Sequence, residues 1–185
     1  MILPIYTYGQ PVLKKKCISI DSEYPGLTEL IQNMWETMYN AQGVGIAAPQ
    51  IGLPIRLFMV DSAQLEDSME EGEKGIKEVM INAEIIEETG DEFSYEEGCL
   101  SIPNIRGNVK RPGDLYIRYY DENFNEKELK LSGVNARVVQ HEYDHIEGVL
   151  FVERLKPVRR NLIKKKLDNM KKGKIKADYP VRVPS

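Results

Sequence analysis

The chain has 185 residues, of which 42% are hydrophobic and 29% are charged, as is usual for a globular domain with its own core. The formal net charge of −4 argues against a protein that binds nucleic acid over its whole surface. No stretch approaches the ~20 apolar residues of a membrane span, and the N-terminus lacks the pattern of a secretory signal. Two isolated cysteines, Cys17 and Cys99, are typical of a reducing compartment. We therefore expect a single domain, residues 1–185, in a cytoplasmic, monomeric protein that does not associate with a membrane.

The first predicted element is an amphipathic helix over residues 26–40, where apolar residues recur every three or four positions. The following stretch AQGVGIAAPQIGLP is rich in glycine and alanine and is predicted to be a loop. IRLFMV (55–60) has the continuous apolar character of a buried strand, whereas the acidic segment 62–75 should be a surface excursion. Further strands are predicted over 78–88, 114–121 and 127–131.

Two more helices are predicted toward the C-terminus. Ser132 can cap a helix over 133–147, which Gly148 ends, and Pro157 can begin a third helix inside the basic region 154–176. The tail KADYPVRVPS should be irregular. The predicted fold class is α+β, with short strands in antiparallel or mixed sheets packed around the central helix and a helix near the C-terminus.

The central helix carries the sequence His141-Glu142-Tyr143-Asp144-His145, which contains both histidines of the chain. On a helix the two imidazoles lie about 40° apart on one face, one turn from each other, and can bind one metal ion. Glu142 lies beside that face, where a carboxylate can accept a proton from water. The alternative is a chance match with two half-buried histidines, which would carry a desolvation cost of about a few kcal/mol.

A catalytic site of the zinc type needs a third protein ligand and one open position, but no histidine remains. Cys17 lies in LKKKCISID and is interpreted as a packing residue. Cys99 lies in YEEGCLSIPNIRG, where Gly98 lets the backbone approach closely, and is the predicted third ligand. A thiolate beside two imidazoles suits zinc or ferrous iron. Two alternatives stay open: an endopeptidase with Asp168 or another acid as the ligand, and a non-catalytic structural site that Cys17 closes.

Three segments resemble the signature motifs of one family, the bacterial form of peptide deformylase, in the family's order. They are GVGIAAPQIG (43–52), EGCLSIP (97–103) and QHEYDHIEG (140–148). The resemblance implies a metal-dependent hydrolase that removes the N-formyl group from nascent chains beginning with formylmethionine and releases formate. It also implies one divalent metal ion, Fe²⁺ in the cell, with Zn²⁺, Ni²⁺ or Co²⁺ able to occupy the site.

The resemblance also implies roles for individual residues. By motif position Glu142 is the general base and acid, while the Gln50 side chain and the Leu100 backbone N–H stabilise the oxyanion. The implied metal ligands are Cys99, His141 and His145. The residues expected to bind substrate are Gly43, Val44, Gly45, Tyr95, Glu97, Gly98, Arg106, Val134, Arg137 and Val138.

Within the substrate-binding set, Gly43 and Gly45 leave room for a peptide to pair along the loop by strand addition. The methionine pocket is expected between Val44, Tyr95, Val134 and Val138. The aliphatic stem of Arg137 should line this pocket while its guanidinium reaches solvent. Glu97 and Arg111 should form a structural ion pair, and Arg106 should meet the peptide backbone beyond the first residue.

The charge of the chain is unevenly distributed. Between Arg154 and Lys176 there are eleven Lys and Arg residues against the single acid Asp168, so this region carries +10 and the remainder −14. One interpretation is an ordinary solvated helix face. The other is contact with ribosomal RNA phosphates, which would be sensitive to salt.

Overall fold

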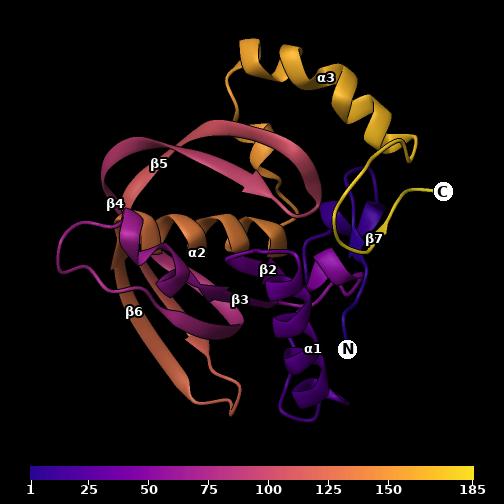
Figure 1. The fold of residues 1–185 in the computed structure, drawn as a ribbon. Coiled ribbons are helices and arrows are strands. Elements are labelled where there is room, and N and C mark those ends of the chain that lie inside the picture. Colours follow the sequence, from indigo (N-terminus) through magenta and orange to yellow (C-terminus); the bar gives the residue numbers. More distant parts are fainter.

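One helix, α2 (Gly133–Ile146), occupies the middle of the molecule, and a curled sheet wraps around it (Figure 1). The structure is a computed structural model that describes all of residues 1–185. Twelve of the fourteen residues of α2 are buried, so its functional side chains lie inside the protein. The α+β class and the central position of the helix with the HExxH sequence are therefore confirmed.

The five strands of the main sheet run antiparallel to their neighbours, in the order β2-β3-β4-β5-β6. Because β2 pairs only with β3, its other edge is not paired with a strand. The strands are β2 (Gly45–Ala47), β3 (Leu57–Asp61), β4 (Lys77–Cys99), β5 (Ile102–Tyr120) and β6 (Glu126–Ser132).

Strand β3 is buried on both faces, which explains its continuous apolar sequence. Phe58 and Val60 belong to the core cluster shared with α2, whereas Leu57 and Met59 belong to the cluster shared with α1 (Leu27–Asn40). Side chains alternate between the faces of a strand, so β3 separates the two helices. Helix α1 begins one residue later than its predicted range.

Two strands are longer than the sequence predicted. β4 continues through 89–99, beyond the predicted strand 78–88, and β5 includes 102–113, ahead of the predicted strand 114–121. The register of this pair shifts at four places, between Ile81 and Glu84, Ile85 and Glu87, Thr89 and Glu92, and Gly98 and Cys99. Such bulges bend and twist a ribbon, and Figure 1 shows β4 and β5 arching over α2.

The ends of α2 agree with the sequence. Ser132 stands at its N-cap position, although its hydroxyl makes no capping hydrogen bond, and the chain turns at Gly148 with φ of +74°. A Cβ at position 148 would lie 2.7 Å from the Lys14 carbonyl oxygen, so only glycine fits there. The predicted loop 41–54 contains β2 and a short 3-10 helix, Ala48–Ile51. Further 3-10 helices span Pro11–Lys14, Ser62–Ser68 and Phe151–Arg154.

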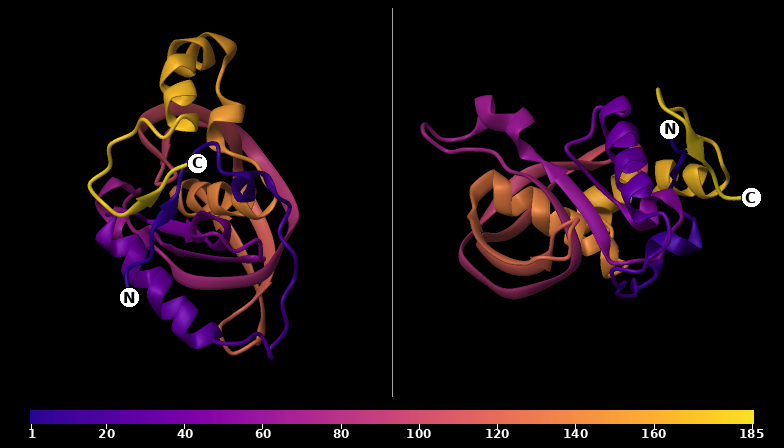
Figure 2. Two further views of the ribbon diagram at one scale, coloured as in Figure 1. Left: turned by 90° about the vertical axis from the view of Figure 1, so that its right-hand side faces the viewer. Right: turned by 90° about the horizontal axis from the view of Figure 1, so that it is seen from below.

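The C-terminal part runs over the surface of the molecule. Helix α3 (Pro157–Lys171) buries only Ile163 and Met170. The tail, predicted to be irregular, instead forms β7 (Val181–Arg182), which pairs in parallel with β1 (Ile5–Tyr6). Figure 2 shows these N- and C-terminal segments side by side. None of the helices has the length and hydropathy that a membrane span requires.

Candidate metal centre

Helix α2 and the end of β4 bring a thiol and two imidazoles together. The ligand atoms of Cys99, His141 and His145 all lie within 4.8 Å of one another. The Cys99 Sγ lies 3.3 Å from His145 Nε2, and the two imidazole centroids are 5.2 Å apart. The three residues that the sequence predicted as ligands, from segments more than forty positions apart, therefore form one cluster.

A bulge at the end of β4 presents Cys99 to the helix. The pairing of β4 with β5 changes register between Gly98 and Cys99, after which the chain turns into β5. A Cβ on Gly98 would lie 2.7 Å from Arg106 Nη1, so the absent side chain leaves space for this guanidinium. The sequence anticipated a close approach at Gly98, and the structure identifies the neighbour as Arg106.

The buried carboxylate of Glu97 orients His141. His141 Nδ1–H donates to Glu97 Oε1 at 2.9 Å, which leaves Nε2 as the imidazole nitrogen available to the cluster. Arg111 binds both Glu97 oxygens, at 2.8 and 2.9 Å, and so confirms the predicted ion pair. Burial alone would raise the pKa of Glu97, but hydrogen bonds from His141 and Arg111 outweigh burial and hold the pKa well below its usual range.

Arg137 corrects one expectation. Its guanidinium was predicted to reach solvent, yet the residue is only 1% exposed. Nη1 donates to Glu97 Oε2 at 3.1 Å and to the Val109 carbonyl at 2.7 Å, while Nη2 donates to the Phe93 carbonyl at 2.6 Å. The guanidinium therefore links the pair of β4 and β5 to the Glu97 carboxylate, which also bonds His141. It does not reach solvent.

The pKa values of the two histidines are shifted in opposite directions. Burial acts to lower the pKa of His141, but hydrogen bonds to Cys99 and Glu97 outweigh burial and raise it well above its usual value. Burial lowers the pKa of His145 well below its usual value, and the positive charge on His141 adds to this effect. His145 thus presents a neutral imidazole, while binding of a cation at His141 would be coupled to release of a proton.

Glu142 lies beside the cluster with a free oxygen. The residue is 4% exposed and its Oε2 has no hydrogen-bond partner. Burial raises the pKa of Glu142 to about 7, although the charge on His141 acts to lower it. Gly45 leaves room for the Glu142 carboxyl group, because a Cβ on residue 45 would lie 2.5 Å from Glu142 Oε1. The carboxyl group can therefore exchange a proton near neutral pH.

Gln50 points its amide nitrogen at the same centre. The residue is 1% exposed and lies in the 3-10 helix Ala48–Ile51, where its Oε1 accepts from the Ala47 N–H at 2.9 Å. Its Nε2 lies 3.1 Å from Ser101 Oγ and 3.6 Å from Cys99 Sγ. The backbone thus fixes the amide orientation, and Ser101, which the sequence analysis left without a role, helps to hold it.

The expected pocket residues lie together. Val134 and Val138 on α2 belong to one core cluster, and Val44 and Tyr95 pack against the same cluster. Gly43 lies against the Leu100 side chain, since a Cβ there would be 2.7 Å from Leu100 Cδ1. Elsewhere, Arg106 is exposed and donates to Glu96 Oε1 at 2.8 Å.

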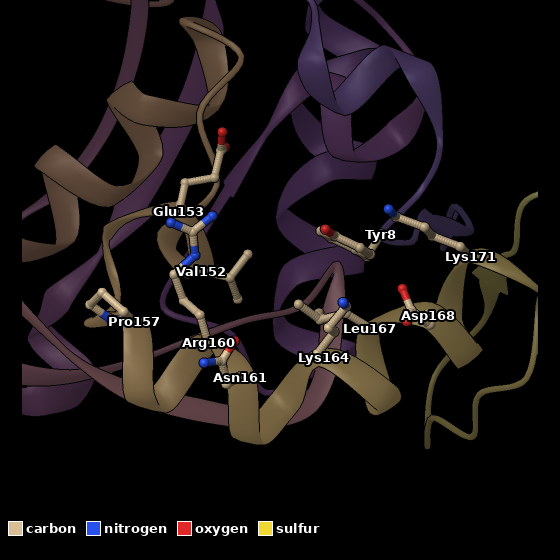
Figure 3. Close-up of a pocket in the computed structure, with 10 residues that line it drawn as sticks. All are labelled: Tyr8, Val152, Glu153, Pro157, Arg160, Asn161, Lys164, Leu167, Asp168 and Lys171. Atoms are coloured by element: carbon tan, nitrogen blue, oxygen red, sulfur yellow. The ribbon is translucent and has the colours of Figure 1, made fainter.

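The two alternative ligands lie elsewhere. Asp168 is on α3, where it lines a hollow of about 420 Å³ together with Tyr8 and Lys171 (Figure 3). Cys17 is 4% exposed and belongs to the apolar core, and burial raises the pKa of its thiol to about 11. Neither residue belongs to the cluster of ligand atoms. An endopeptidase site that uses Asp168 and a structural site that Cys17 closes are therefore unsupported.

The residues of the cluster fit a transition metal ion. Thiolate and imidazole are the donors that zinc and ferrous iron favour. His145 Nδ1 and Glu142 Oε2 are buried without hydrogen-bond partners. Burying an unpaired polar atom costs free energy, which a cluster with a purely structural role would not explain. Three protein ligands next to a buried carboxylate match a catalytic metal site with one position left for water. The central helix and this centre together define a metal-dependent hydrolase.

The chain belongs to the peptide deformylase family, because residues 2–161 match the family model described as polypeptide deformylase. It is 54% identical to a peptide deformylase of Christiangramia forsetii, across 100% of this chain and 97% of that protein. A peptide deformylase of Flavobacterium psychrophilum is 53% identical, over 99% and 97% of the two chains.

A solved structure supports the same assignment. The peptide deformylase of Thermus thermophilus is 36% identical, with a TM-score of 0.81 over 94% of this chain and 99% of that chain. Enzymes of this family depend on a metal and remove N-formyl groups from nascent polypeptides, and this chain is such a hydrolase.

Proposed function

We propose that the cluster binds one divalent metal ion and is the centre at which this chain removes formyl groups. The observation that carries the proposal is the convergence of a thiol and two imidazoles within 4.8 Å, beside a buried carboxylate oxygen without a partner. A bound ion would act as a Lewis acid that polarises the formyl carbonyl and acidifies water. Fe²⁺ is the proposed metal in the cell, and Zn²⁺, Ni²⁺ or Co²⁺ can replace it because soft thiolate and imidazole donors accept all four.

Glu142 is the residue that moves the proton. Its carboxylate accepts a proton from the attacking water and then donates that proton to the leaving amine. A pKa of about 7 supports both roles, because the group can gain and lose a proton near neutral pH. Gly45 supports the assignment by leaving the carboxylate room next to β2.

Two donors stabilise the oxyanion that forms on the former formyl oxygen. The Gln50 amide is oriented toward Cys99 by its bond from the Ala47 N–H, and Leu100 directly follows Cys99. The proposed donors are Gln50 Nε2 and the Leu100 backbone N–H. Removing one such preorganised donor costs about 3 kcal/mol of transition-state stabilisation.

The substrate is an N-formylmethionyl peptide, whose backbone pairs with the free edge of β2. Its methionine side chain is proposed to pack against Val44, Tyr95, Val134 and Val138, which share one apolar core cluster. Arg106, which is exposed, contacts the peptide backbone beyond the first residue. Glu97 and Gly98 contribute backbone alone, because the Glu97 carboxylate is already occupied by His141 and two arginines.

Ribosomal RNA is the proposed partner of α3. Its basic side chains, Arg159, Arg160, Lys164, Lys165, Lys166 and Lys171, are exposed. Arg160, Lys164 and Lys171 also line the hollow beneath the helix (Figure 3). A row of exposed cations suits contacts with phosphates, and such contacts release counterions and weaken as salt rises.

The proposed location is the cytoplasm, where nascent chains are made, and the proposed state is a monomer. Both cysteines are free thiols, which suits a reducing compartment. Sedimentation of the purified enzyme at several concentrations tests the proposed monomeric state. If the protein forms dimers, its sedimentation coefficient should rise with concentration.

The test of the proposed function is formate release from formyl-Met-Ala-Ser by anaerobically purified protein. Wild-type protein should release formate, and Glu142→Ala should keep its metal but lose about 10²- to 10⁴-fold in kcat, because it lacks the proton acceptor. Glu122→Ala changes an exposed acid in the loop between β5 and β6 and is the matched control. Equal kcat values for the two variants would contradict the role of Glu142, and a wild-type protein without formate release would contradict the function.

A further inference from the structure

The turn Cys99–Leu100–Ser101 contains the proposed thiolate ligand and the proposed oxyanion donor, and both ends of the chain hold it. The Tyr179 hydroxyl donates to the Leu100 carbonyl at 2.7 Å. The Tyr8 N–H donates to the Ser101 carbonyl at 2.8 Å. Two consecutive carbonyls of the turn are therefore fixed from outside the sheet, one by the C-terminal tail and one by the N-terminal segment.

The two segments that hold the turn are also bonded to each other. The Ile5 N–H donates to the Pro180 carbonyl at 2.9 Å and the Thr7 N–H to the Arg182 carbonyl at 3.1 Å, on either side of the β1–β7 pair. Asn104 Nδ2 adds a bond to the Lys176 carbonyl at 3.0 Å. The tail is thus secured on both sides of Tyr179, which gives its hydroxyl a fixed position (Figure 2).

The Tyr179 ring is partly buried against the core cluster that also contacts Leu100 and Ile51. The ring can keep this packing without its hydroxyl, so the hydroxyl has a separable role. The tail also lies beyond residues 2–161, which match the family model.

We propose that Tyr179 is a positioning residue for deformylation, which acts through Leu100. Its hydrogen bond fixes the Leu100 carbonyl and so limits rotation of the turn that orients both the Leu100 N–H and the Cys99 thiol. The inference rests on the proposed function, because it needs the Leu100 N–H to stabilise the oxyanion. A small misplacement of such a donor is expressed in kcat more than in substrate binding.

Tyr179→Phe removes the hydroxyl and keeps the ring. We expect kcat for formyl-Met-Ala-Ser to fall roughly fivefold, the effect of losing one neutral hydrogen bond, with KM and metal content unchanged. In cobalt-loaded protein the visible spectrum should shift, since it reports the geometry of the thiolate ligand. The matched control is Tyr116→Phe, which loses a hydroxyl bonded to Glu128 on the outer face of the sheet.

A lower kcat in Tyr179→Phe, at a melting temperature equal to that of Tyr116→Phe, would support the inference. Equal kcat values and equal cobalt spectra in the two variants would overturn it. So would a loss of kcat that only follows a lower melting temperature, because the hydroxyl would then serve stability alone. A wild-type enzyme without formate release would instead contradict the proposed function, so the two failures are distinguishable.

Discussion

Gly45 shows how a single residue controls the geometry of the centre. It lies on β2, whose other edge is the proposed place for the peptide, and its missing side chain gives Glu142 the space beside the metal ligands. A methyl group there would overlap Glu142 Oε1 at 2.5 Å and the carboxyl carbon at 2.8 Å. Glu142 is packed and buried, so it can move away only by leaving its position for proton transfer.

We therefore expect Gly45→Ala to lower kcat by about 10²-fold or more, because a displacement of the order of 1 Å misaligns a catalytic group. The cluster of ligand atoms should still bind metal, since the clash falls on Glu142. Gly113→Ala, where a Cβ would meet the Asp91 backbone oxygen at 3.0 Å within the pair of β4 and β5, is the control. Steady-state kinetics with metal analysis measure the effect, and a kcat within about twofold of the control would show that Glu142 tolerates the methyl group.

Among individual residues, the sequence predicted those that a short spacing identifies and the one left as a candidate ligand once no histidine remained. The i, i+4 histidines indicated their common face, and the lack of a third histidine indicated a cysteine. Arg137 could not be predicted, because its partners are the Phe93 and Val109 carbonyls and Glu97. These partners lie on β4 and β5, 28 to 44 positions from Arg137 in the sequence, so its buried environment could not be recognised from the helix alone.

Among the elements, the ribbon of β4 and β5 shows where sequence patterns stop being informative. Residues 86–92 are all exposed, so they lack the apolar alternation that reveals a half-buried strand. Backbone pairing with the partner strand and the bulges determine the ribbon instead. Strand β3 was predictable for the opposite reason, because both of its faces are buried and its sequence is continuously apolar.

Ribosome binding by α3 is better tested by reversing the charge of its lysines than by removing the helix. A chain that ends at Val158 would also lose β7 and the Tyr179 contact, so its loss of activity would be ambiguous. We expect Lys164→Glu with Lys165→Glu to weaken ribosome binding and to reduce its dependence on salt, because two phosphate contacts become repulsive. Hydrolysis of formyl-Met-Ala-Ser should be unchanged, since both residues are exposed on α3, which lies on the outside of the molecule and apart from α2 (Figure 1).

Cosedimentation with ribosomes at several salt concentrations measures this effect. Lys110→Glu with Lys130→Glu makes the same change in net charge on exposed positions of the sheet and is the control. Equal binding by the two double variants would contradict a specific role for α3 and would favour an ordinary solvated helix face.

In the molecule as a whole, a buried ionic network joins the sheet to the central helix. Arg111 of β5 bonds both Glu97 of β4 and Asp144 of α2, the latter at 2.8 Å, and Arg154 donates to both oxygens of Asp144. The same Glu97 holds His141. The network that positions the metal ligand therefore also couples the stability of the ribbon to that of the helix.

This network predicts how stability depends on pH. The pKa of Glu97 lies well below its usual value in the folded protein, so its contribution is present above the unfolded pKa of about 4.3 and is lost as pH falls toward the folded pKa. Glu97→Gln should lower the free energy of unfolding of metal-free protein by about 3–5 kcal/mol at pH 7, since two buried arginines lose their carboxylate. The gap between variant and wild type should narrow below about pH 4.

Urea unfolding at a series of pH values measures this gap. Glu84→Gln removes an exposed partner of Arg118 and should leave the free energy of unfolding nearly unchanged at every pH, because solvent screens this ion pair. A gap for Glu97→Gln that stays constant down to pH 3 would show that the carboxylate does not carry the acid sensitivity.

The most direct test of the central claim is a crystal structure of the metal-loaded protein with anomalous scattering recorded at the absorption edge of the metal. The zinc form should show one ion about 2.3 Å from Cys99 Sγ and about 2.1 Å from Nε2 of both histidines, with water in the remaining position. An ion bound away from Cys99, or a fourth protein side chain that fills the open position, would contradict the account of a catalytic centre.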